Sequence, residues 1–331
     1  LFSGAELLYI KLNKDLQLSF YAFSLAQFVL IFLILLIPTT LMGATLPVLS
    51  RFFVKEVQAL GNRVGLLYAL NTFGAVLGAY LTGFYLIPTV GVTAALQMGA
   101  TLNVGIGALV LVFEKHLGRL GLPSPSFVTP SQQRGLESGT RNPGAEGMTI
   151  LLTVVGFGLS GAASMIYEVA WTRALALVIG SSTYAFSTML VAFLTGLALG
   201  SSLFARAARL FRVTPLSFAL LQLGIGLGAL LLMPLFEKMP EFFLAAFRLS
   251  SSPAFIRTAQ FIISFVAMLL PTLFMGATFP CAAQIAARGA HRVGYDVGTV
   301  YSVNTAGAIG GTILAGFLLI VATGFQRTQD P

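Results

Sequence analysis

The sequence predicts an all-α, polytopic transmembrane helix bundle built from a repeated unit. Hydrophobic residues make up 56% of the 331 residues and charged residues only 9%, whereas a soluble domain usually carries about a quarter charged residues. The apolar runs are continuous and roughly 20 residues long, which is the length of a helix that crosses lipid. Residues 38–91 and 271–324 also align without a gap at an offset of 233, with 22 identities in 54 positions. Because the matches include Pro, Gly, Tyr and Asn, this register indicates a duplicated structure.

Eight membrane-spanning helices are predicted from these runs. Three helices of the second copy, over 149–236, have no counterpart in the first copy. A complete repeat would therefore contain six helices, and we expect an incomplete 6 + 6 arrangement that lacks three helices at its start and one at its end. The predicted spans cover about 19–50, 64–87, 92–113, 149–171, 183–205, 215–236, 256–285 and 297–322.

A linker is predicted between the two repeats. Residues 114–148 are rich in Pro, Gly, Ser and charge, so we expect 1–113 to be the end of the first repeat and 149–331 to be the second. If the loops alternate between the two sides of the membrane, twelve of the 19 Lys and Arg residues fall on the side of the linker. The positive-inside rule then predicts a cytoplasmic linker. The basic charge sets the orientation in the lipid bilayer, and no nucleic acid partner is expected.

Two of the predicted helices contain a pair of prolines each. A proline inside a helix removes one backbone hydrogen bond and kinks the helix. The prolines are either packing kinks or the breaks of a discontinuous helix whose freed backbone groups line a cavity. The four positions are Pro38, Pro47, Pro271 and Pro280.

The next helix of each copy carries a polar face followed by two glycines. Tyr68 and Asn71 lie one turn apart and are followed by Gly74 and Gly78, and the second copy repeats this pattern as Tyr301, Asn304, Gly307 and Gly311. Small residues allow helices to approach closely, so the glycines favour contacts between helices. The asparagines are equally suited to hydrogen bonds between helices and to binding a substrate.

An acidic and a basic residue interrupt the apolar run from Ile150 to Ile179. Ionisable groups at membrane depth are costly and usually face the interior of a bundle, with a partner. If one long helix covers the run, Glu168 and Arg173 are both intramembrane. If the helix ends near Trp171, Tyr167 and Trp171 form an interfacial belt and Arg173 reaches toward water. Glu168, with Arg173 or another helix as its partner, is the leading candidate site. The remaining candidates for binding or coupling are Tyr167, Tyr184, Tyr68, Asn71, Tyr301 and Asn304.

No metal site, cofactor or catalytic residue is expected. Cys281 is the only cysteine, and the two histidines fall in separate predicted loops.

Residues 160–202, PTLFMGATFP (271–280) and VGTVYSVNTAGAIGG (297–311) resemble the membrane region of the fused major-facilitator/spermidine synthase-like family. The resemblance implies two six-helix repeats of major-facilitator type and a bacterial inner (plasma) membrane location. It also implies a soluble aminopropyltransferase-like domain as a possible partner. None of that domain is present in the 331 residues, so its activity is assigned to no residue here.

Two functions remain open from the sequence. The first is a transporter-like module that moves a small polar or cationic solute, such as the polyamines that the family resemblance suggests, by alternating access. The alternative is a membrane anchor or complex subunit that tethers an aminopropyltransferase-like domain and transports nothing.

Overall fold

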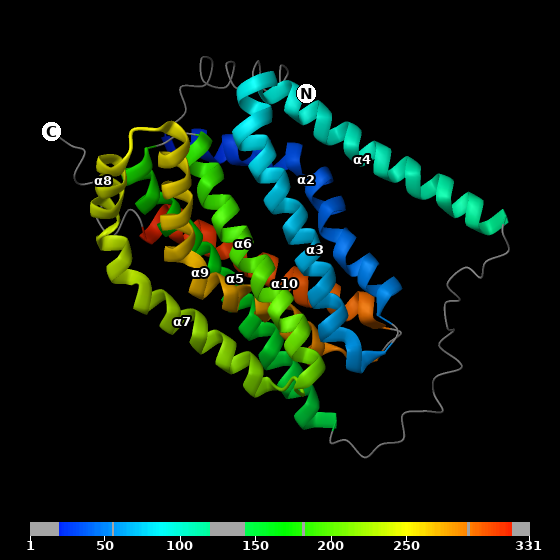
Figure 1. Cartoon of the computed structure of the whole chain (residues 1–331). Helices are drawn as coiled ribbons and strands as arrows, with labels where there is room; N and C mark the ends of the chain where they lie inside the picture. The colour runs from blue at the N-terminus through cyan, green and yellow to red at the C-terminus, as the bar shows by residue number, and fades with distance from the viewer. Residues whose placement is uncertain (1–19, 55, 120–142, 181–182, 290–291, 320–331) are drawn as a thin grey trace. The chain divides into compact units, whose positions relative to one another are not determined.

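The computed structural model describes residues 20–54, 56–119, 143–180, 183–289 and 292–319, and in this part of the chain helices joined by short connections are the only regular elements, with no strand (Figure 1). The elements are α2 (Phe20–Phe53), η1 (Val57–Ala59), α3 (Leu60–Leu81), η2 (Thr82–Leu86), α4 (Ile87–Arg119), α5 (Pro143–Ile179), α6 (Thr183–Leu210), α7 (Pro215–Glu237), α8 (Met239–Leu249), α9 (Pro253–Ala286), α10 (Val293–Ile313) and η4 (Leu314–Leu319).

The repeat seen in the sequence is also present in the secondary structure. Helix α9 ends 233 residues after α2. Helix α10 begins 233 residues after α3, and each is followed by a short π-helix, η2 in the first copy and η4 in the second. The two aligned segments therefore fold into the same series of elements. The major-facilitator arrangement of the repeats stays a prediction.

Six helical segments of the described chain are long and apolar enough to cross a membrane. One of them, Leu60–Phe113, contains two of the predicted spans, α3 and α4. The two predicted spans are separated at Gly91, within the bounds of α4, where φ of 78° and ψ of 170° are not helical. The described residues of the eighth predicted span, 297–319, form α10 and η4 and are not among the six, and residues 320–322 lie outside the described part of the chain.

Residues 1–48 and 49–331 form two compact units. In the first unit, α2 continues unbroken through Pro38 and Pro47. The Thr39 and Thr40 hydroxyls donate to the carbonyl oxygens of Leu35 and Leu36, each at 2.6 Å. In this way the two hydroxyls find partners within their own helix, where lipid offers none.

The second unit is organised by three closely packed helix pairs (Figure 1). Helix α6 lies against α9 and α3, and α5 lies against α10. Helix α9 also contacts α7 and continues unbroken through the buried Pro271 and Pro280. In the described chain, the continuous helices do not match the discontinuous-helix interpretation of the prolines.

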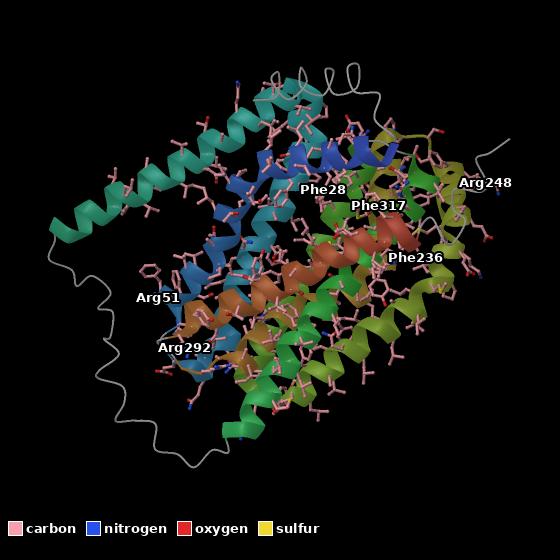
Figure 2. All side chains as sticks on the ribbon, turned by 180° about the vertical axis from the view of Figure 1, so that it is seen from behind. Phe28, Arg51, Phe236, Arg248, Arg292 and Phe317 are labelled. Atoms are coloured by element: carbon pink, nitrogen blue, oxygen red, sulfur yellow. The ribbon has the colours of Figure 1, made fainter. Side chains whose placement is uncertain are left out.

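At one end of the second unit, the first residues of α3 and α10 lie near the last residues of α6 and α9. The Gly61 N–H donates to Gln284 Oε1, and Asn62 Nδ2 donates to the Ala205 carbonyl oxygen. Figure 2 shows Arg51 and Arg292 toward this end and Arg248 toward the opposite one. The described residues of the loops 51–63, 206–214 and 286–296 therefore lie at one end, as the alternation of loops predicts.

Candidate functional site

A cavity of about 140 Å³ lies where α3, α5, α6, α9 and α10 come together in the second unit. Its polar groups are neutral hydroxyls and one amide, and the rest of its lining is aromatic or aliphatic. No charged side chain lines it in the described chain. The polar lining residues are Tyr68, Ser160, Ser164, Thr278, Tyr301 and Asn304.

Two tyrosines that match in the repeat face this cavity from different helices. Tyr68 on α3 and Tyr301 on α10 both pack against the Phe279 ring of α9, with centroid distances of 5.1 and 5.8 Å. Phe157 of α5 packs on the same ring at 6.0 Å. Matching residues of the two copies therefore meet at one site, where an aromatic cluster fixes their rings.

Helices α5 and α10, which both line the cavity, pack with their backbones in direct contact. A Cβ on Gly307 would overlap the Gly158 carbonyl oxygen, and a Cβ on Gly311 would overlap that of Ala162. The predicted role of Gly307 and Gly311 in helix contact is therefore confirmed. Gly74 and Gly78 of α3 have nothing within 4 Å of such a Cβ in the described chain.

Glu168 lies outside the cavity, on the same face of α5 as two of the lining serines. Helix α5 continues to Ile179, so one long helix covers the whole apolar run. Ser160, Ser164 and Glu168 follow one another at four-residue spacing, which places them on one face of α5. The Glu168 side chain is half-buried and lies one turn beyond the lining residue Ser164.

Arg173 forms no ion pair with Glu168. The two residues are five positions apart on α5, which separates their directions by about 140° around the helix axis. Arg173 is exposed, whereas Glu168 is half-buried. The predicted pair is therefore not formed between these two described residues.

The other candidates also lie outside the cavity lining. The Tyr167 ring stacks on Trp171 at 5.4 Å as part of an apolar cluster. Tyr184 is exposed, with its ring 5.8 Å from that of Phe84. Asn71 is exposed. Of the eight candidates, Tyr68, Tyr301 and Asn304 are thus the three that the fold brings together.

Sequence reasoning missed Asp296, a buried carboxylate at the start of α10. It is 6% exposed, and its Oδ2 accepts a hydrogen bond of 2.9 Å from the backbone N–H of Arg288. The next basic residue, Arg292, lies 5.2 Å from the centre of the Tyr295 ring. The signal in the sequence is an acidic residue in the first turn of a helix that follows a short loop. The Asp296 side chain therefore joins the first turn of α10 to the loop that follows α9.

Asp296→Ala is expected to lower the free energy of unfolding by about 1–3 kcal/mol, because it leaves the Arg288 N–H without its acceptor. Denaturation of the detergent-solubilised protein measures this change. Asp296→Asn keeps an acceptor oxygen and should retain most of the stability. Equal losses in the two variants would show that the negative charge, not the hydrogen bond, is what matters.

An all-helical fold with six long apolar helices defines an integral membrane protein. Beyond this class, no family model, curated protein or solved structure matches the chain.

Proposed function

We propose that this chain is a transporter-like membrane module that binds a small polar or cationic solute in the cavity between α3, α5, α6, α9 and α10. The observation that carries the proposal is the convergence of Tyr68 and Tyr301, matching residues of the two repeats, on one cavity. Transporters built from repeats commonly place their sites where the repeats meet. The resemblance to the fused spermidine synthase family suggests polyamines as the first solutes to test.

The lining suits an organic cation or a neutral polar solute. Tyrosine and phenylalanine rings attract a cation through their negative faces. The amide of Asn304 and the hydroxyls of Ser160 and Ser164 supply hydrogen bonds. Glu168, one turn beyond Ser164 on the same face of α5, is the acidic group placed to attract a cation toward the cavity. The site proposed here therefore keeps Glu168 in an approach position and omits Arg173, Tyr184 and Asn71.

Uptake of radiolabelled spermidine into liposomes that contain the full-length native protein tests this function. Glu168→Gln, which removes the acidic charge, and the double variant Tyr68→Leu/Tyr301→Leu, which removes both rings, are each expected to reduce uptake at least about tenfold, a change of roughly 1.4 kcal/mol in binding. Glu241→Gln, at an exposed carboxylate of α8, is the matched control and should leave uptake unchanged. Flux no greater than that of protein-free liposomes would reject transport of this solute. Equal uptake by all variants would reject the site.

A non-transporting membrane anchor for an aminopropyltransferase-like domain is the second candidate. It is favoured by the absence of a charged side chain from the cavity lining in the described chain, because proton-coupled transport usually requires titratable groups at membrane depth. For an anchor, Glu168→Gln should leave aminopropyl transfer by the full-length protein unchanged, and no solute should cross the membrane.

A further inference from the structure

A second cavity, of about 240 Å³, lies between the start of α5, the end of α9 and the start of α10. It shares no lining residue with the cavity that Tyr68 and Tyr301 face. Gly147, which begins the apolar span of α5, and Ala286, which ends that of α9, both line it. The cavity therefore lies where the apolar spans meet the basic loops, at the level of the polar headgroups of a bilayer.

Two arginines bring positive charge to this cavity. Arg288 follows α9 and Arg292 precedes α10, and both side chains are exposed. Neither forms an ion pair with a carboxylate among the residues that the structure describes. The Arg292 guanidinium lies 5.2 Å from the centre of the ring of Tyr295, which also lines the cavity. Two guanidinium groups that converge without a carboxylate partner are typical of a phosphate-binding site.

One carboxylate, that of Asp296, also lines the cavity. It is 6% exposed, and the backbone N–H of Arg288 already donates to its Oδ2 atom. Two exposed arginines against one buried aspartate leave the described lining with a net positive charge, and the positive groups are the accessible ones. This distribution favours an anion over a cation.

The wall that α5 contributes to the cavity is apolar. It consists of Ile150, Leu151 and Val154, and more than half of the Leu151 surface is exposed. An acyl chain gains free energy by packing on such a wall, whereas a water-soluble phosphate compound does not. The volume is also smaller than the roughly 300–1,000 Å³ of a site that encloses a whole drug-sized ligand. The cavity therefore suits a headgroup whose chains continue along α5 into the bilayer.

We propose that Arg288 and Arg292 bind the phosphate of an anionic phospholipid in this cavity, with an acyl chain against the apolar residues of α5. Basic pockets between transmembrane helices on the cytoplasmic side are suited to lipid headgroups, and anionic lipids give that leaflet its negative surface potential. The cavity is on the side of the linker, for which the distribution of basic residues predicts this orientation. The bound lipid joins the α9–α10 connection to α5. This proposal does not depend on transport.

Native mass spectrometry of the full-length native protein, supplied in detergent with equal amounts of phosphatidylglycerol and phosphatidylcholine, measures the binding. The protein is expected to retain phosphatidylglycerol in preference. Arg288→Gln/Arg292→Gln should retain at least about tenfold less of it, a change of roughly 1.4 kcal/mol, and the same amount of phosphatidylcholine. The matched control is Arg209→Gln/Arg212→Gln, which removes two exposed arginines at the same end that do not line the cavity. Equal retention of phosphatidylglycerol by the two double variants would overturn the proposal.

Thermal midpoints in detergent supply a test that needs no variant. Phosphatidylglycerol is expected to raise the midpoint of the unsubstituted protein more than phosphatidylcholine does, because a ligand that binds the folded state stabilises it. Inorganic phosphate in excess carries the charged group without the chains, so it should not displace the lipid. Equal midpoints with the two lipids, or displacement of phosphatidylglycerol by inorganic phosphate, would each overturn the proposal.

Discussion

Gly200→Leu is expected to destabilise the folded protein severely. Gly200 lies where α6 meets α9, and a Cβ there would overlap the carbonyl oxygen of Leu273. Gly276 of α9 faces α6 in the reciprocal way, with the Leu197 carbonyl oxygen in the place of a Cβ. The obstructing atoms are backbone atoms of a packed helix, so they cannot turn aside as a side chain would. Relief requires the two helices to separate.

Separation of α6 from α9 would affect most of the second unit. Helix α6 also packs on α3, where the Ser201 hydroxyl donates to the Gly65 carbonyl oxygen at 2.7 Å. Helix α9 carries Phe279, on which Tyr68 and Tyr301 pack. Forced overpacking commonly costs 1–3 kcal/mol, and with no room for adjustment we expect about 3 kcal/mol or more. Such a loss is a large share of a typical stability of about 5–15 kcal/mol.

The fraction of monodisperse protein after detergent extraction measures this effect, and a thermal midpoint can be obtained from whatever remains folded. Gly226→Leu on α7 is the matched control, because nothing in the described chain lies within 4 Å of a Cβ there. It should behave as the unsubstituted protein does. If Gly200→Leu is as stable as Gly226→Leu, the close α6–α9 contact is not present in the native protein.

Local and repeated features of the fold could be predicted from the sequence. Continuous apolar runs identify the helices, because lipid leaves the backbone no other way to satisfy its hydrogen bonds. The ungapped register predicts that α9 repeats α2 and that α10 repeats α3, as their bounds show. The spacing of Gly307 and Gly311 also predicts a close helix contact. It does not say which helix makes that contact, or why Gly74 and Gly78 lack one among the residues that the structure describes.

The candidate site was only partly predictable, because it is assembled from five helices that are far apart in the sequence. The spacing of Tyr301 and Asn304 places them on one face of a helix, but Phe279 joins Tyr301 to Tyr68 only after the helices pack. Glu168 and Arg173 look like a pair because both interrupt an apolar run. Their separation of five positions directs them to different sides of α5, and a continuous helix fixes that separation.

Trp171→Ala is expected to be the most damaging truncation in the apolar cluster of α5, α6, α7, α8 and α9. Trp171 is 8% exposed. Its ring stacks on Phe236 of α7 at 5.8 Å with an angle of 9° between the planes, and it meets Phe193 of α6 edge-on at 6.4 Å. Removal of a buried Trp side chain typically costs about 3–5 kcal/mol, partly through the cavity that it leaves. We expect a loss in this range.

Thermal midpoints in detergent measure this effect against two controls. Trp171→Phe keeps a ring in the stack and should recover much of the stability, whereas Phe242→Ala removes an exposed ring of α8 and should cost little. Equal midpoints for Trp171→Ala and Phe242→Ala would contradict the packing role of Trp171.

The same cluster decides what Tyr167 does. Its ring stacks on Trp171 outside the cavity lining, so Tyr167→Phe should retain both the thermal midpoint and solute uptake. A loss of uptake with an unchanged midpoint would instead assign the Tyr167 hydroxyl to the solute site.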